Sequence, residues 1–109
     1  MQVTYHLVPR AEWEATDPAQ PYVPAGFSSQ GFVHCTDGAD EVAATANRYY
    51  SRVVDLLVLS IDVSKVEAPV RYEDSGRIYP HVYGAIPRAA IVDVRSMQLD
   101  AQGIWAPPA

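Results

Sequence analysis

Cysteine and lysine are both scarce in this sequence, and each shortage excludes a class of protein. The single cysteine, Cys35, rules out an intrachain disulfide and any zinc site built from several cysteines. Lys65 is the only lysine, the other cations are arginines, and no basic run occurs in a chain of net charge −5. Binding to a nucleic-acid backbone or to an anionic membrane is therefore not expected as the main function.

Long hydrophobic runs are also missing. No apolar stretch approaches the roughly 20 residues that a membrane-spanning helix needs. The first residues lack the charged-then-apolar pattern of a secretion signal. We therefore expect a soluble, cytoplasmic protein that does not engage a membrane.

Histidine occurs only at His6, His34 and His81, each in or beside a predicted strand. Three imidazoles could bind zinc, but no pair shows the i, i+4 spacing of ligands on a helix, so no metal is expected. His34 and Thr36 match one half of the paired His-x-Ser/Thr pattern of some phosphoesterases. The other two histidines do not supply the second half, which argues against that chemistry.

Hydrophobic residues make up 49% of the sequence, which is ordinary for a globular protein. The length of 109 residues allows one domain and leaves no room for two. We place this domain at residues 1–99 and expect residues 100–109 to be a C-terminal tail. The predicted elements are a strand at 3–8, a short helix at 10–16, a Pro-rich loop at 17–26, a brief strand starting at 31, a helix to about 51, strands at 55–62, 70–73 and 91–99, and a helical turn at 87–90. The loop at 17–26 is long for a compact domain and is a candidate lid or rim.

Two elements are defined most clearly by their residue pattern. The main helix starts after an N-cap at Thr36 or Asp37. Its apolar face is formed by Val42, Ala46, Tyr49, Tyr50 and Val53. The near-continuous apolar run from Asp55 to Asp62 predicts a central strand buried on both sides. Because strands and helices do not alternate regularly, we expect a small α+β domain with a mixed or antiparallel, split sheet and one main helix.

The segment from Arg71 to Gly84 is the strongest candidate for a ligand site. Glu73, Arg77 and His81 lie close together in it, in a stretch broken by Gly and Pro. They are interleaved with the tyrosines Tyr72, Tyr79 and Tyr83. An acid, a guanidinium and an imidazole held on short strands and turns can face one cleft and bind a polar or anionic small ligand. The alternative is a hairpin whose charges are solvated and whose tyrosines belong to the core.

Two side chains have competing interpretations. Cys35 would need His34 as a base to act as a nucleophile, but neighbouring side chains on a strand point to opposite faces, so Cys35 is expected in the core. Glu73 could orient a ribose hydroxyl or stabilise a positively charged sugar. Equally, it could be an exposed partner of Arg71 or Arg77.

Short motifs occur in a characteristic order along nearly the whole chain, to about residue 99. They are Tyr5–Leu7, Trp13, Gly31–Thr36, Ala46–Tyr50, Leu57–Asp62, Val70–Glu73 and Tyr79–Gly84. Together they resemble the DUF952 family, a domain of unknown function found in small bacterial and plant proteins. That family looks distantly related to the ADP-ribosyltransferase superfamily, whose small split-sheet α+β fold clamps NAD.

This resemblance implies an ADP-ribosyltransferase-like fold with a cleft for NAD or a related nucleotide. In that superfamily a histidine on the first core strand holds a ribose hydroxyl, and an acid on a later strand acts at the glycosidic bond. The resemblance gives these roles to His6 and Glu73, and adds His34 to the catalytic set. The transferases usually carry glycine after the histidine, where this chain has Leu7. The NAD-binding residues that it implies are His6, Thr36, Arg77, His81 and Tyr83.

Three functional hypotheses follow. The leading one is transfer or hydrolysis at the nicotinamide–ribose bond of NAD, with phosphate bound by Arg77. The second is a non-catalytic binding or sensor module that holds a nucleotide or another small ligand in the same pocket. The third is a structural protein whose histidines only satisfy hydrogen bonds.

Overall fold

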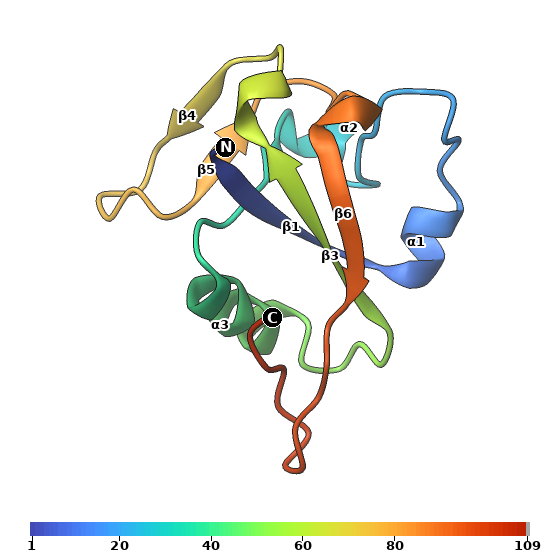
Figure 1. Cartoon of the computed structure of the whole chain (residues 1–109), viewed down its shortest axis with the longest axis vertical. Coiled ribbons are helices and arrows are strands. Elements are labelled where there is room, and N and C mark those ends of the chain that lie inside the picture. Colours follow the sequence, from blue (N-terminus) through green and yellow to red (C-terminus); the bar gives the residue numbers. More distant parts are fainter. Residues whose placement is uncertain (109) are drawn as a thin grey trace.

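Two three-stranded antiparallel sheets form the framework of the protein, which a computed structural model describes over residues 1–108 (Figure 1). The first sheet has the strand order β1 (Val3–Pro9), β3 (Leu56–Asp62) and β6 (Ile91–Ser96), and the second has the order β2 (Val33–His34), β5 (Pro80–Val82) and β4 (Val70–Tyr72). The expected small α+β architecture is therefore confirmed. Every strand pairing within the described residues is antiparallel, so the mixed-sheet alternative is wrong.

Helices connect the strands, and within residues 1–108 only one of them is longer than five residues. They are α1 (Arg10–Glu14), α2 (Phe27–Gln30), α3 (Ala39–Tyr49) and the 3₁₀ turns η1 (Val63–Lys65) and η2 (Arg88–Ala90). The expectation of one main helix is thus confirmed, and η2 occupies the predicted helical turn. The four residues of α2 were not predicted as a helix, because so short a segment shows no periodic pattern.

β3 is the central strand of the first sheet, as its apolar run predicts, and all seven of its residues are buried. Successive side chains point to opposite faces of the sheet. On one face Leu59 shares a core cluster with Val33 and Val82 of the second sheet. On the other face Val58 shares a second cluster with Val42 of α3. The first sheet is therefore the middle layer, between the second sheet and α3.

α3 begins later than the sequence pattern predicts. Its N-cap is Gly38, because both expected caps have partners elsewhere. The backbone of Thr36 pairs with that of Tyr5, and the carboxylate of Asp37 accepts a hydrogen bond from the Tyr72 hydroxyl. Tertiary contacts therefore hold these two residues outside the helix.

The buried face of α3 is narrower than predicted. Val42 and Ala46 are fully buried, and Tyr50 and Val53 pack against the same cluster. Tyr49, which was expected on this face, is 70% exposed. The helix ends at residue 49 rather than near 51.

The C-terminal residues fold back onto α3 instead of leaving the domain. β6 ends at Ser96, short of the predicted residue 99, and Met97 turns into the core. Trp105 is only 3% exposed and shares the cluster beneath α3. Asn47 accepts the backbone N–H of Trp105 at 2.8 Å and donates to its carbonyl oxygen at 3.0 Å. The packed domain thus extends beyond residue 99, while Ala109 of the expected tail lies outside the described residues.

β1 lies at the edge of the first sheet and forms one backbone bridge to the segment that follows β2. There Tyr5 and Thr36 exchange backbone hydrogen bonds of 2.9 and 2.8 Å. Beyond this bridge, no strand of the described chain pairs with the outer edge of β1 from His6 to Pro9. The two sheets therefore diverge along this edge.

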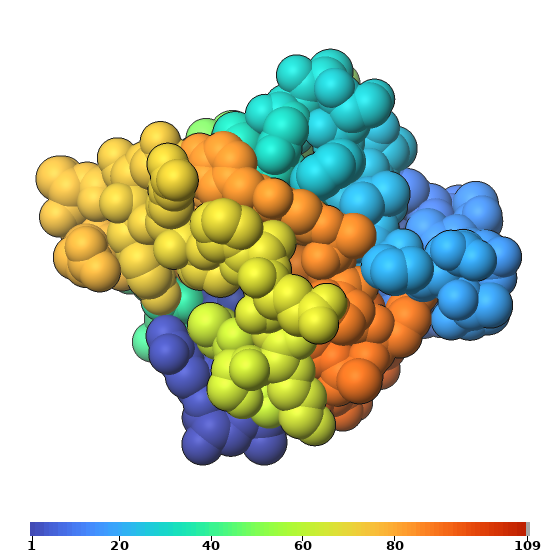
Figure 2. All heavy atoms as spheres, turned by 90° about the horizontal axis from the view of Figure 1, so that it is seen from above, coloured from blue at the N-terminus to red at the C-terminus, as the bar shows by residue number. Residues whose placement is uncertain are grey.

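The Pro-rich loop at residues 17–26 is fixed against the body of the protein. Figure 2 shows it lying against the segment that follows β5, where Tyr22 is fully buried and forms an antiparallel bridge with Ile86. Arg88 donates hydrogen bonds to the carbonyl oxygens of Asp17 and Gln20. These contacts make the loop a rim with fixed anchors.

Candidate functional site

A cleft of about 760 Å³ lies where β1 and β2 diverge. Its walls come from β1, α1, the end of the Pro-rich loop, α2, β2, α3 and the hairpin of β4 and β5. This volume falls within the range of about 300–1,000 Å³ typical of small-molecule sites. The split between the sheets therefore creates a site of ligand size.

Aromatic rings and charges cover the outer face of the second sheet beside this cleft. The strand register places His34 opposite His81, and His81 opposite Arg71. Cross-strand partners share one face of a sheet, and the two imidazole rings lie edge to face with 5.4 Å between their centroids. Phe32 stacks on the His81 ring at 4.0 Å. The two imidazoles are thus held in place by packing within the protein.

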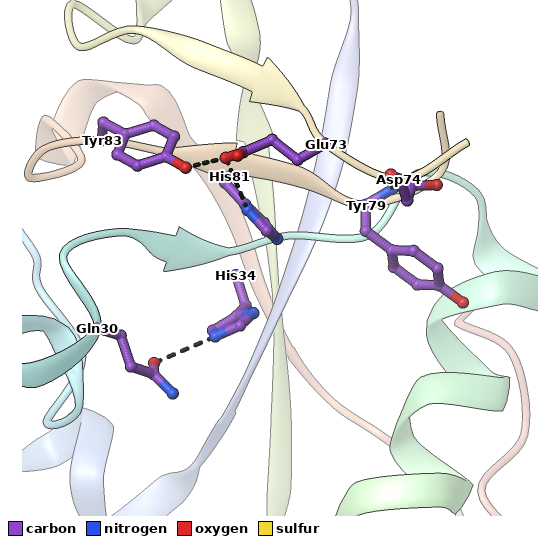
Figure 3. A network of polar contacts seen from close by, with 7 residues as sticks. All are labelled: Gln30, His34, Glu73, Asp74, Tyr79, His81 and Tyr83. Atoms are coloured by element: carbon purple, nitrogen blue, oxygen red, sulfur yellow. Dashed lines mark hydrogen bonds and ion pairs between the residues drawn. The ribbon is translucent and has the colours of Figure 1, made fainter. Parts of the chain in front are cut away.

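Glu73 follows β4 and reaches over the same face. Its Oε1 accepts a hydrogen bond from the Tyr83 hydroxyl and lies 3.3 Å from Nδ1 of His81 (Figure 3). The Glu73 side chain is 50% exposed, so this ion pair contributes little to stability. The ion pair instead orients the His81 ring, and the Glu73 carboxylate places a negative charge at the cleft.

His34 is held from the opposite side by α2. Its Nε2 lies 3.1 Å from Oε1 of Gln30, which also lines the cleft (Figure 3). Partial burial, followed by the positive charge of protonated His81, lowers the pKa of His34. His34 is therefore harder to protonate than a free imidazole.

Both ring nitrogens of His6 are already engaged within the protein. Nδ1 is 2.6 Å from the carbonyl oxygen of His34, which can only accept, so Nδ1 carries the proton. Nε2 then accepts a hydrogen bond of 2.7 Å from the Tyr22 hydroxyl. Burial lowers the pKa of His6 to about 4, although the bond to His34 opposes this shift. His6 is therefore neutral at pH 7 and serves to join the two sheets.

Arg77 does not line the cleft, in contrast to its predicted position. It lies in the turn between β4 and β5 with a φ of 52°, and its guanidinium is 4.9 Å from the centroid of the Tyr72 ring. Asp74 builds this turn by accepting the backbone N–H groups of Ile78 and Tyr79 at 2.9 and 3.1 Å. The same turn brings Tyr79 into the cleft lining.

Arg48 of α3 is the arginine among the lining residues. Its guanidinium lies 5.7 Å from the centroid of the Tyr49 ring, and hydrogen bonding to Tyr79 and then to Tyr49 raises the pKa of Arg48. Tyr50 lines the same cleft. A guanidinium beside several phenol rings can bind an anionic group together with an aromatic ring.

The cleft unites most of the predicted site residues: His6, His34, Thr36, Glu73 and His81. Arg77 and Tyr83 do not line it, but Tyr83 is connected to it through its bond to Glu73 and its edge-to-face contact with His81. Sequence reasoning missed Arg48, whose exposed position on a helix gives no local signal of a site. Tyr79 was not predicted as a site residue either. Its position between the Asp74 turn and His81, within the predicted segment, could have indicated it.

Cys35 is a core residue, as predicted. It is 3% exposed and belongs to the cluster between the sheets, while His34 points outward from the opposite face. Burial raises the pKa of the Cys35 thiol to about 12, so almost no thiolate forms near neutral pH. Nucleophilic chemistry at Cys35 is therefore not supported.

Two further kinds of feature are absent from the part of the chain that the structure describes. Within residues 1–108, no group of three or more His, Cys, Asp or Glu side chains is arranged to hold a metal ion. Over the same part of the chain, no helix combines the length and the apolar character needed to cross a bilayer.

Solved structures of one protein share this fold. The X-ray structure of protein CC0527 from Caulobacter crescentus is 21% identical, with a TM-score of 0.80 over 95% of this chain and 93% of that chain. The solution NMR structure of CC0527 is 22% identical, with a TM-score of 0.74 over 95% and 91% of the two chains. At these identities the likeness shows the fold alone. No curated protein matches the sequence.

The sequence also matches a family model. The model described as "Protein of unknown function (DUF952)" covers residues 7–94, from β1 into β6. This stretch includes most of the cleft lining and more than half of the chain. The chain therefore belongs to the DUF952 family.

Proposed function

We propose that the cleft binds NAD or a related nucleotide. The observation that carries this proposal is the free edge of β1 at Leu7, which lines the cleft. Backbone groups along an antiparallel strand point alternately towards and away from the paired strand. The backbone N–H and C=O of Tyr5 point away from β3 and pair with Thr36. The N–H and C=O of Leu7, two residues later, therefore point the same way.

The N–H and C=O of Leu7 have no partner among residues 1–108. One backbone donor and one acceptor on the same strand edge complement a carboxamide, such as that of nicotinamide. The Leu7 side chain is buried in the cluster beneath α3, so it leaves the strand edge accessible. A backbone contact of this kind does not require glycine at position 7.

Other lining groups complement the remaining parts of a nucleotide. Arg48 offers a guanidinium for phosphate oxygens, which takes over the role first expected of Arg77. Tyr79 and Tyr49 offer aromatic rings for stacking. Because both ring nitrogens of His6 are engaged, His34 is the imidazole that would contact a ribose hydroxyl.

A reaction at the nicotinamide–ribose bond is the catalytic form of this proposal. It draws on the resemblance to ADP-ribosyltransferases and on Glu73, whose carboxylate lies at the cleft and can stabilise a positively charged sugar. Binding without reaction is the second candidate. The observation in its favour is that His6 lacks the free ring nitrogen that the resemblance expects.

Binding is tested first by thermal unfolding of the protein with NAD, ADP-ribose, nicotinamide or inorganic phosphate. A ligand at 100 times its Kd stabilises the folded state by about 2.7 kcal/mol, so NAD should raise the melting temperature. A melting temperature unchanged by all four compounds would exclude the nucleotide cleft.

The catalytic form is tested by the release of nicotinamide from NAD in the wild type and in Glu73→Gln. We expect the substitution to abolish release without lowering the NAD-induced rise in melting temperature. Glutamine keeps the shape of the side chain and removes its charge. If Glu73→Gln releases nicotinamide at the wild-type rate, the carboxylate has no part in the reaction.

A further inference from the structure

His81 is the most strongly positioned imidazole at the cleft. Phe32 stacks on its ring with an interplanar angle of 15°, which fixes the ring plane. Glu73 lies 3.3 Å from Nδ1, which fixes the rotation of the ring (Figure 3). The side chain retains 21% exposure, so it stays accessible from the cleft that it lines.

These contacts determine where the neutral ring carries its proton. A carboxylate can only accept a hydrogen bond, so Nδ1 of His81 donates to Glu73. Nε2 is then left with a lone pair, and none of the hydrogen bonds within residues 1–108 involves it. An imidazole with one nitrogen held by a carboxylate and the other free is arranged to accept a proton from a bound hydroxyl group or water.

We propose that His81 is the general base of the cleft, with Glu73 and Phe32 as the residues that position it. This inference rests on the proposed function and names the group that activates the acceptor. Nε2 of His81 takes a proton from water as the water oxygen bonds to C1′ of the nicotinamide ribose. The C1′–N bond breaks, and its electron pair stays on the ring nitrogen of nicotinamide, which leaves uncharged. His81 then returns the proton to solvent, so that NAD and water give ADP-ribose, nicotinamide and one proton.

Charged and titratable groups from several elements surround the His81 ring. The titratable or charged groups that face it are Glu73, Asp74 and Arg71 around β4, His34 on β2 and Tyr83 beyond β5. Glu73 bonds directly to the ring, and partial burial, followed by the charge of His81, lowers the pKa of His34. The bond from Nδ1 to a carboxylate therefore distinguishes His81 from His34, whose Nε2 is held by the Gln30 amide.

Chemical rescue separates a catalytic role of His81 from a structural one. His81→Ala should retain the NAD-induced rise in melting temperature and lose about 10²- to 10⁴-fold in nicotinamide release. Added imidazole should restore part of that rate, because it can occupy the space beside Phe32 and accept the proton. Glu73→Gln, which keeps the His81 ring, should release no nicotinamide either with or without added imidazole.

The outcomes distinguish this inference from the function on which it rests. Normal turnover in His81→Ala, or a slow variant that imidazole does not rescue, would overturn the role of His81 as base. NAD binding by a wild type that releases no nicotinamide would overturn it as well, while leaving the binding function intact. Absence of NAD binding would overturn both.

The proton position gives a second readout that needs no substrate. Nitrogen-15 spectra of the His81 ring should show the hydrogen on Nδ1 and a bare Nε2 in the neutral form. In Glu73→Gln the preference for this tautomer should weaken, because an amide can donate as well as accept. A neutral wild-type ring that carries its hydrogen on Nε2 would contradict the proposed arrangement.

Discussion

His6 is uncharged in the folded protein at neutral pH, because burial between the sheets lowers its pKa to about 4. Its two hydrogen bonds connect β1 to the backbone of His34 and to Tyr22 in the Pro-rich loop. One neutral imidazole thus joins three segments that are distant in the sequence. Protonation would add a second N–H where Nε2 now accepts from Tyr22.

This arrangement predicts a loss of stability in mild acid. The unfolded chain protonates His6 near the ordinary value of about 6.5, whereas the folded protein resists protonation down to about 4. The contribution of His6 is therefore fully present above pH 6.5 and is lost as the pH falls to 4. The expected loss is about 3 kcal/mol in the free energy of unfolding.

Urea unfolding at a series of pH values measures this effect. In His6→Gln the fall in unfolding free energy between pH 6.5 and 4 should largely disappear, even if the variant is less stable throughout. His34→Gln removes an exposed imidazole and should keep most of the slope. Equal slopes in the wild type and in His6→Gln would show that His6 does not control acid stability.

Among the secondary-structure elements, α3 is held in place by the C-terminal segment around Trp105. Trp105 fills the space beneath the helix and donates its indole N–H to the carbonyl oxygen of Tyr50 at 3.0 Å. Asn47 holds both backbone groups of the same residue. Because α3 also carries Arg48 into the cleft, the C-terminal segment supports the site from outside it.

Trp105→Ala should therefore destabilise the protein by about 3–5 kcal/mol, the usual range for removing a buried tryptophan. Ile104→Ala is the matched control, because Ile104 is 50% exposed and its removal should cost less than about 0.5 kcal/mol. Chemical unfolding of both variants measures the difference. Similar stabilities for the two variants would show that the C-terminal segment does not support the domain.

The residue pattern along the sequence correctly predicted β3 and α3, whose formation depends mainly on neighbouring residues. The apolar run of β3 and the periodic residues of α3 specify a buried strand and a helix without reference to the rest of the chain. The start of α3 was predicted wrongly because Thr36 and Asp37, both good caps, have partners on β1 and β4. Trp105 was assigned to a tail because its partner Asn47 lies 58 residues away.

The candidate site was predicted in part for the same reason. The hairpin of β4 and β5 places Glu73 and His81 together locally, so their proximity could be expected from the sequence. The role of binding phosphate was assigned to Arg77, which is near them in the sequence. Arg77 instead lies in the turn between β4 and β5, with a φ of 52°. Arg48 reaches the cleft only because α3 packs beside the diverging strands.

At the scale of the whole molecule, the cleft is a feature of one compact body. The Cα radius of gyration is 13.2 Å, close to the value of about 13 Å expected for a single domain of this length. The opening therefore arises from the split between two sheets within one domain rather than from a gap between two domains. Its rim and its imidazoles are held by contacts within the protein, so a ligand of the proposed kind would meet a preformed site.

The most direct test of this account is a calorimetric titration of NAD into the wild type, Arg48→Ala and Arg77→Ala. Each variant removes one exposed arginine, but only Arg48 lines the cleft. We expect NAD to bind the wild type, Arg48→Ala to weaken binding by about 10- to 100-fold through loss of a charge-assisted hydrogen bond, and Arg77→Ala to change it by less than about twofold. No binding to the wild type, or equal losses in the two variants, would contradict the nucleotide cleft.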